Sequence, residues 1–105
     1  DIVLLEVRKT APSTMEAFKF KFDAGGEFDM VIYDKASRNC RLYEIKHSTE
    51  TSEKQTLHLR DAEKCQIVEK RFGPISGKFV LYRGKDTFAE GVQYLNVENF
   101  LCGLK

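Results

Sequence analysis

An alternation of aromatic and charged residues near the N-terminus constrains the fold more than any other feature of this sequence. From residue 18 to residue 23, every second position is phenylalanine and the positions between are charged. A period of two places the aromatic side chains on one face of a β-strand. The segment 23–26 ends in two glycines and suits a tight reversal, and residues 27–33 and 40–47 have the composition of further strands. We therefore expect three consecutive strands in an antiparallel meander.

Helical and strand-like patterns alternate in the rest of the chain. Residues 1–9 predict the last turns of a helix. The oxygen-rich segment 48–53 offers caps for a second helix, whose apolar residues follow at helical spacing up to the Gly-Pro pair at 73–74. The apolar run 79–82 predicts a buried strand that joins the sheet in parallel after the helical crossover.

The C-terminal part completes the predicted order of elements. Tyr94 and Leu95 suggest a fifth strand, and Asn96 can cap a final helix. The sequence thus predicts an α/β fold in the order α-β-β-β-α-β-β-α, with a mixed sheet of about five strands flanked by helices. A length of 105 residues favours one compact domain.

Composition excludes several classes of protein. Hydrophobic residues make up 42% and charged residues 31%, which is typical of a globular domain rather than a disordered tail. The apolar run 2–5 is too short to cross a membrane and no secretory signal is present, so we expect a cytoplasmic protein. A net charge of +1 gives little long-range attraction to a polyanion. The spacing of the three cysteines fits neither a zinc knuckle nor a disulfide framework, and we interpret them as buried or half-buried side chains.

The second and third predicted strands bring charged residues together. If Tyr33 pairs with Cys40 across the hairpin, directly opposed residues share a face of the sheet. In that register two pairs at the far end of the hairpin are charged: Asp29 with Glu44, and Glu27 with Lys46. The face therefore gathers three carboxylates and one ammonium at one end.

The opposite face of the same hairpin is largely ordinary core. It receives three pairs in this register: Phe28 with Ile45, Met30 with Tyr43, and Ile32 with Arg41. Only the charged face needs a chemical explanation, because Asp29 beside Glu44 causes a like-charge repulsion that a divalent cation would relieve.

The residues of the charged face suit magnesium or manganese. Carboxylates are hard ligands that bind Mg²⁺ or Mn²⁺, and Mg²⁺ commonly uses one or two of them. Lys46, two residues after Glu44, could orient an attacking water or stabilise charge on a phosphate. The alternative is a solvated ionic ladder on an exposed sheet surface. The apolar neighbours Leu42, Tyr43 and Ile45 favour a central strand, in which an unpaired charge is unusual.

These residues also carry a family resemblance. The segment 26–32, followed after a loop by residues 42–46, resembles the Asp and Glu-x-Lys elements of the PD-(D/E)xK nuclease superfamily. Across almost all of its length, the chain is similar to the C-terminal domain of unknown function that follows the ATPase module in many bacterial and archaeal AAA-type ATPases. The later matches are residues 55–57, 77–82 and 94–101.

The resemblance implies a restriction-endonuclease-like core and a set of site residues. It assigns metal binding to Asp29 and Glu44, with help from the main-chain carbonyl of Ile45, and catalysis to Lys46. The family often adds a glutamate from the preceding helix. Glu6 is the candidate for that role here, unless the usual glutamate lies upstream of Asp1. Two further residues could contact substrate: Gln55, which otherwise is a helix-surface residue, and His47, which otherwise is simply exposed.

Two functions follow as hypotheses. The first is a nuclease-like domain that uses Mg²⁺ or Mn²⁺ to hydrolyse phosphodiester bonds in nucleic acid, with DNA as the first candidate, or an inactive descendant of one. The alternative is a noncatalytic domain, attached to an AAA-type ATPase, that binds a partner. The resemblance implies that the chain is the C-terminal fragment of a longer protein with an ATPase module upstream. The G-x-x-x-x-G-K-[ST] phosphate loop, which is absent from these residues, should then occur in that upstream part.

Overall fold

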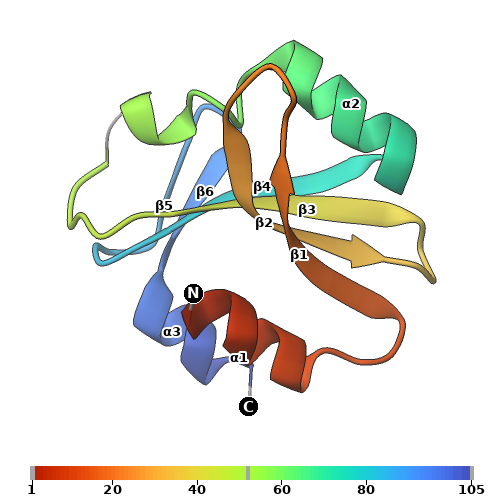
Figure 1. Ribbon diagram of the computed structural model, residues 1–105. Helices are drawn as coiled ribbons and strands as arrows, with labels where there is room; N and C mark the ends of the chain where they lie inside the picture. Colours follow the sequence, from red (N-terminus) through yellow and green to blue (C-terminus); the bar gives the residue numbers. More distant parts are fainter. Residues whose placement is uncertain (1, 52, 105) are drawn as a thin grey trace.

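The computed structural model describes residues 2–51 and 53–104, with the side chains of all of these except residues 53 and 55. A mixed six-stranded sheet, in the strand order β1-β2-β3-β4-β6-β5, forms the centre. Helix α2 covers one face of the sheet, and α1 and α3 lie together on the other (Figure 1). The bounds are α1 Ile2–Thr10, β1 Met15–Lys21, β2 Glu27–Asp34, β3 Asn39–Ile45, the 3-10 helix η1 Glu53–Thr56, α2 Ala62–Phe72, β4 Ile75–Tyr82, β5 Thr87–Ala89, β6 Val92–Asn96 and α3 Val97–Cys102.

The sheet combines an antiparallel meander with parallel crossovers. β1, β2 and β3 pair antiparallel in succession, which confirms the predicted meander. α2 connects β3 to β4, and these two strands pair in parallel. The segment that contains β5 connects β4 to β6, and these two strands also pair in parallel. The predicted α/β class is confirmed, while the described sheet has six strands where about five were expected.

Helix α2 begins later than its predicted caps in segment 48–53. The side chain of Asp61 accepts hydrogen bonds from the backbone amides of Glu63 and Lys64, and so satisfies two free donors of the first turn. The helix ends as predicted at Gly73, whose φ of 85° suits glycine. The oxygen-rich segment leads instead into the short helix η1.

Two apolar clusters, one on each face of the sheet, form the core. The α2-face cluster comprises Phe22, Phe28, Val31, Cys40, Leu42, Leu59, Cys65, Val68, Val80, Tyr82, Val92 and Tyr94. The α1/α3-face cluster comprises Val3, Leu4, Val7, Ala17, Met30, Ile32, Tyr43 and Leu81. Side chains of neighbouring strand positions alternate between the two clusters, as the pleat of a strand requires.

One irregularity in β2 breaks this alternation. Phe18 pairs with Val31 and Phe20 pairs with Phe28, so that one residue in β1 stands opposite two residues, Asp29 and Met30, in β2. This is a β-bulge, in which an extra residue turns the strand locally. The placement of Phe28 with Ile45 on the α1/α3 face was therefore wrong, because the bulge moves Phe28 into the α2-face cluster beside Val31.

Between β2 and β3, the predicted hairpin register is confirmed as far as Met30. Tyr33 pairs with Cys40, and Val31 pairs with Leu42. On the other face, the predicted pairs are Met30 with Tyr43 and Ile32 with Arg41, and both are present.

The three cysteines are all free thiols in different surroundings. Cys40 and Cys65 are buried, as predicted, and burial raises the pKa of the Cys40 thiol to about 11. Cys102 is exposed, so its interpretation as a buried side chain was wrong. Within the residues that the structure describes, no helix is long and apolar enough to cross a membrane.

Candidate metal centre

Glu44 is a carboxylate in the middle of the sheet. β3 lies between β2 and β4, and Glu44 pairs in register with Val80 of β4. The residue is only 2% exposed, although a glutamate is seldom buried without a partner. Its position two residues after Leu42 places its side chain on the α2 face. The sequence thus puts an ionisable group where an apolar side chain would ordinarily stand.

The surroundings of Glu44 do not compensate its charge. Burial and the neighbouring Asp29, which acts both as a hydrogen-bond partner and as a like charge, together raise the pKa of this carboxyl to about 8. The ammonium of Lys46 lies 3.7 Å from Oε2 of Glu44, which is the distance of an ion pair rather than of a hydrogen bond. Its positive charge acts in the opposite direction and lowers the pKa of Glu44. The buried Oε1 atom of Glu44 has no hydrogen-bond partner among the residues that the structure describes.

Asp29 reaches the same place from the bulge of β2. Its Oδ2 atom accepts a hydrogen bond of 2.8 Å from the backbone amide of Ile45. This contact replaces the predicted ladder pair of Asp29 with Glu44, since the pairing of β2 with β3 extends only as far as Met30 and Tyr43. The two carboxyl groups are nevertheless neighbours, as the effect of Asp29 on the pKa of Glu44 requires.

Glu27 does not pair with Lys46 as predicted. It stands opposite Lys21 in β1, and its Oε2 atom lies 3.9 Å from the ammonium of Lys19. Lys19 and Glu27 form an ion pair, but this distance is too long for a hydrogen bond. The buried Oε2 atom of Glu27 therefore has no hydrogen-bond partner in the described part of the chain. The prediction failed because β3 ends at Ile45, after which the amide of Lys46 donates to Leu81 of β4.

The other candidate residues lie outside this arrangement or outside the described side chains. Glu6 pairs with Lys9 one turn later in α1, at 3.4 Å. α1 packs on the face of the sheet opposite to Glu44, and none of the contacts described for Glu6 reaches Asp29 or Glu44. His47 is exposed after the end of β3. The side chain of Gln55 lies outside the described residues.

Asp29 and Glu44 fit a divalent cation as a two-carboxylate site. Within the described residues, no group of three or more His, Cys, Asp and Glu side chains is placed to hold a metal ion. Mg²⁺ does not require three such side chains, because it keeps several waters and often binds one or two carboxylates. An unpartnered buried oxygen beside a second carboxyl group is what a cation would satisfy. The role of the Ile45 carbonyl as a further ligand remains a prediction.

Comparison with known proteins adds no relative. Family models, curated proteins and solved structures were all searched, and none matches this chain. The site therefore rests on its own geometry.

Two features of the site were not predicted from the sequence. The first is the bulge at Asp29 and Met30, and the second is the hydrogen bond from the Ile45 amide to Asp29. Both depend on how β2 pairs with its two neighbouring strands, which the alternation within β2 does not indicate.

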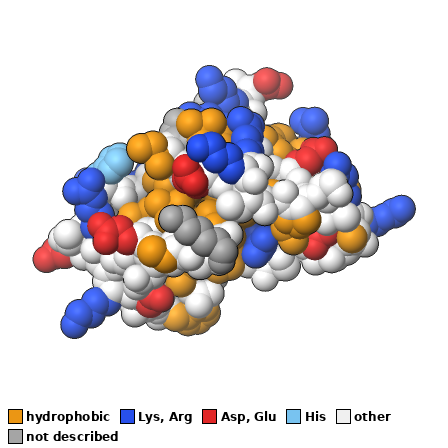
Figure 2. Space-filling view, turned by 90° about the horizontal axis from the view of Figure 1, so that it is seen from below, with side chains coloured by type: hydrophobic (Ala, Val, Ile, Leu, Met, Phe, Trp, Pro, Cys, Tyr) orange, Lys and Arg blue, Asp and Glu red, His pale blue; other side chains and the backbone are white. Residues whose placement is uncertain are grey.

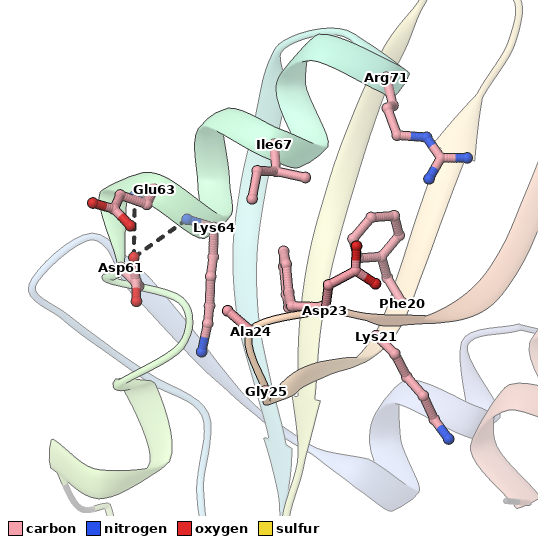
Figure 3. Close-up of a pocket in the computed structure, with 11 residues that line it drawn as sticks. Phe20, Lys21, Asp23, Ala24, Gly25, Asp61, Glu63, Lys64, Ile67 and Arg71 are labelled. Atoms are coloured by element: carbon pink, nitrogen blue, oxygen red, sulfur yellow. Dashed lines mark hydrogen bonds between the residues drawn. The ribbon is translucent and has the colours of Figure 1, made fainter.

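A pocket of about 570 Å³ also lies away from the site, between the β1–β2 turn and α2 (Figure 3).

Proposed function

We propose that this chain is a PD-(D/E)xK nuclease-like domain that holds Mg²⁺ or Mn²⁺ at Asp29 and Glu44 and hydrolyses phosphodiester bonds in nucleic acid, DNA first among them. The observation that carries the proposal is the unpartnered Oε1 atom of Glu44, buried in a central strand beside Asp29. A protein interior rarely keeps such an atom unless a ligand satisfies it.

Each side chain of the site has a distinct task in this proposal. Asp29 and Glu44 would hold the cation, and the amide of Ile45 fixes the direction of the Asp29 carboxylate. A bound divalent cation neutralises charge on a phosphate and lowers the pKa of water. Lys46 keeps its side chain 38% exposed at the edge of the site, where its ammonium can meet a phosphate oxygen and stabilise negative charge in the transition state.

Direct measurement of metal binding tests the first half of the proposal. Isothermal titration calorimetry with MnCl₂ should show saturable binding to the native protein and none to Asp29→Asn or Glu44→Gln. Glu6→Gln is the matched control, because Glu6 contacts Lys9 and lies in a helix on the other face. Equal binding by the native protein and by Glu44→Gln would overturn the metal site.

Cleavage of labelled DNA tests the second half. With Mg²⁺ or Mn²⁺ present, Lys46→Ala should lose about 100-fold or more of the cleavage rate while it keeps metal binding, since a group that stabilises developing charge contributes on this scale. Absence of cleavage of single- and double-stranded DNA by the native protein, with metal binding intact, would remove the nuclease activity alone. It would leave a metal-binding, noncatalytic domain.

The noncatalytic domain attached to an AAA-type ATPase remains the second candidate. The observation that favours it is the 2% exposure of Glu44, because this carboxylate must become accessible before a phosphodiester can reach it. Such a domain would bind its partner equally well with EDTA and with Mg²⁺. This insensitivity to metal separates it from the first candidate.

A further inference from the structure

A groove lies between the β1–β2 turn and α2. Its volume is about 570 Å³, and Figure 3 shows the turn on one side and the helix on the other. It lies on the α2 face of the sheet, the face that also carries Glu44. The lining residues that matter here are Phe20, Asp23, Asp61, Lys64, Ile67 and Arg71.

Three residues of α2 form a stripe along the groove. Lys64, Ile67 and Arg71 follow one another at intervals of three and four residues, so they lie on one side of the helix. The two cations are seven residues apart, which corresponds to ~10.5 Å along the helix axis. Ile67 stands between them and is 45% exposed, which is unusual for a large apolar side chain. The stripe therefore presents a cation at each end and an apolar surface in the middle.

Aromatic rings hold both cations in place. The Lys64 ammonium lies 5.5 Å from the centre of the Phe22 ring. The Arg71 guanidinium lies 5.5 Å from the centre of the Phe20 ring and 5.3 Å from that of Phe72. Such cation–π contacts restrict the conformations of the two side chains. Preorganised cations bind an anion with less loss of conformational entropy.

The acidic residues of the groove limit its attraction to polyanions at long range. The Asp61 carboxylate caps α2 by accepting from the amides of Glu63 and Lys64. Asp23 and Glu63 add negative charge at the rim, opposite in sign to Lys64 and Arg71. An anionic ligand is therefore recognised by short-range contacts at the two cations rather than by the field of the whole surface.

The Lys64 end of the groove leads toward the metal centre. The Lys64 ammonium lies 2.7 Å from Nδ1 of His58 and borders the backbone of Gly26, where an added Cβ atom would approach it to 2.7 Å. Gly26 precedes Asp29 by three residues in the chain, a distance of ~10 Å along an extended strand. The Lys64 end of the groove thus borders β2 within ~10 Å of Asp29 along the strand.

We propose that this groove binds single-stranded nucleic acid, with one phosphate at Lys64, another at Arg71 and a base against Ile67 and Phe20. The ~10.5 Å between the two cations along α2 separates the two phosphate contacts. Contact of a base with the apolar floor requires an unpaired, splayed strand, as in other single-strand binding surfaces. The biological meaning of the groove rests on the proposed nuclease function, whereas the binding itself does not need the metal.

Fluorescence anisotropy with a labelled oligothymidylate, in EDTA, tests this groove. We expect Lys64→Ala and Arg71→Ala each to weaken binding about 5-fold at low salt and to reduce the slope of log K against log salt by ~0.7, the value for one lost contact to a single strand. Ile67→Ala should weaken binding without changing the slope, because it removes apolar contact only. Lys70→Ala is the matched control, since Lys70 is exposed on the same helix but does not line the groove.

The outcomes separate this groove from the metal centre. Thermal unfolding of each variant shows whether a weaker affinity reflects lost folding, and Arg71→Lys, which keeps the charge, should retain the salt slope. Equal effects of Lys70→Ala and Arg71→Ala, or binding of acidic peptides in place of the oligonucleotide, would overturn the proposal. Asp29→Asn and Glu44→Gln should leave binding in EDTA unchanged, so a failure of the nuclease proposal does not alter this result.

Discussion

The two faces of the sheet bury similar kinds of side chain but differ in one respect. The α1/α3-face cluster is wholly hydrophobic, and its centre is Tyr43 stacked on Phe79, with 4.8 Å between ring centres. The α2 face carries Glu44 and the bulge that brings Asp29 to it. Seen from the α1 and α3 side, the surface shows hydrophobic side chains among scattered charges of both signs (Figure 2).

This difference indicates that the α1/α3 face stabilises the fold, whereas the α2 face carries polar groups that lower its stability. A carboxylate with a raised pKa, an unpartnered oxygen and a neighbouring acid all destabilise the folded state near neutral pH. None of these features occurs in the α1/α3-face cluster as described. Four changes test this division, from the largest expected effect to the smallest.

Removal of the central ring of the α1/α3 face should cause the largest loss. Tyr43 is 2% exposed and contacts both Phe79 and Phe100. Tyr43→Ala should lower the free energy of unfolding by about 4 kcal/mol, as large-to-small changes of core aromatics do. Urea unfolding by circular dichroism measures it. A loss below about 1 kcal/mol would mean that this face is not the stabilising one.

On the α2 face, the expected signature is a pH dependence due to Glu44. Its pKa is raised from 4.5 to about 8 on folding, so the folded protein binds this proton more tightly than the unfolded chain does. Stability should therefore fall as the pH rises from about 4.5 to about 8, by at most ~1.4 kcal/mol per pH unit. Glu44→Gln should remove this part of the slope.

Urea unfolding of the native protein and of Glu44→Gln at several pH values makes that comparison. The difference between the two slopes isolates Glu44 from the other titrating groups, which both proteins share. Parallel slopes would show that the carboxyl of Glu44 ionises as readily in the folded chain as in the unfolded one.

A divalent cation should reverse the penalty on the α2 face. At a concentration ten times the dissociation constant, Mg²⁺ or Mn²⁺ should raise the free energy of unfolding by about 1.4 kcal/mol. The effect should grow with pH, because the cation competes with the proton of Glu44. Thermal unfolding at pH 8 with and without MnCl₂ measures it, and Glu44→Gln serves as the control that should not respond.

Loss of the cap of α2 should have the smallest effect. Asp61→Ala removes the acceptor for the amides of Glu63 and Lys64 and should lower the free energy of unfolding by about 1 kcal/mol. A loss above 3 kcal/mol would mean that Asp61 does more than cap the helix.

Local patterns of the sequence predicted most of the fold. The alternation around Phe18, Phe20 and Phe22, the Gly25-Gly26 turn and the Asn96 cap act within a few residues, and each occurs where expected. β5 was missed because its three residues are all exposed and carry no hydrophobic pattern. The cap of α2 was misplaced because several oxygen-bearing residues in segment 48–53 competed with the single Asp61 that caps it.

The site was harder to predict than the fold, because it depends on contacts between strands. The hairpin register correctly brought Asp29 near Glu44, but the extra residue of β2 is visible only from its pairing with β1. Similarly, the acidic residues interspersed on α2 favoured a solvated helix surface over phosphate contacts by Lys64 and Arg71. This helix surface becomes one wall of a groove because the β1–β2 turn lies opposite it.

The bulge also makes the site depend on the number of residues in β2 as well as on their identity. Deletion of Met30 would leave one residue between Phe28 and Val31, matching the single residue between Phe18 and Phe20 in β1. Asp29 would then take the position of Met30 in the α1/α3-face cluster and point away from Glu44. A one-residue deletion would thus separate the two carboxyl groups while every acidic side chain remains in the sequence, so their proximity depends on strand length.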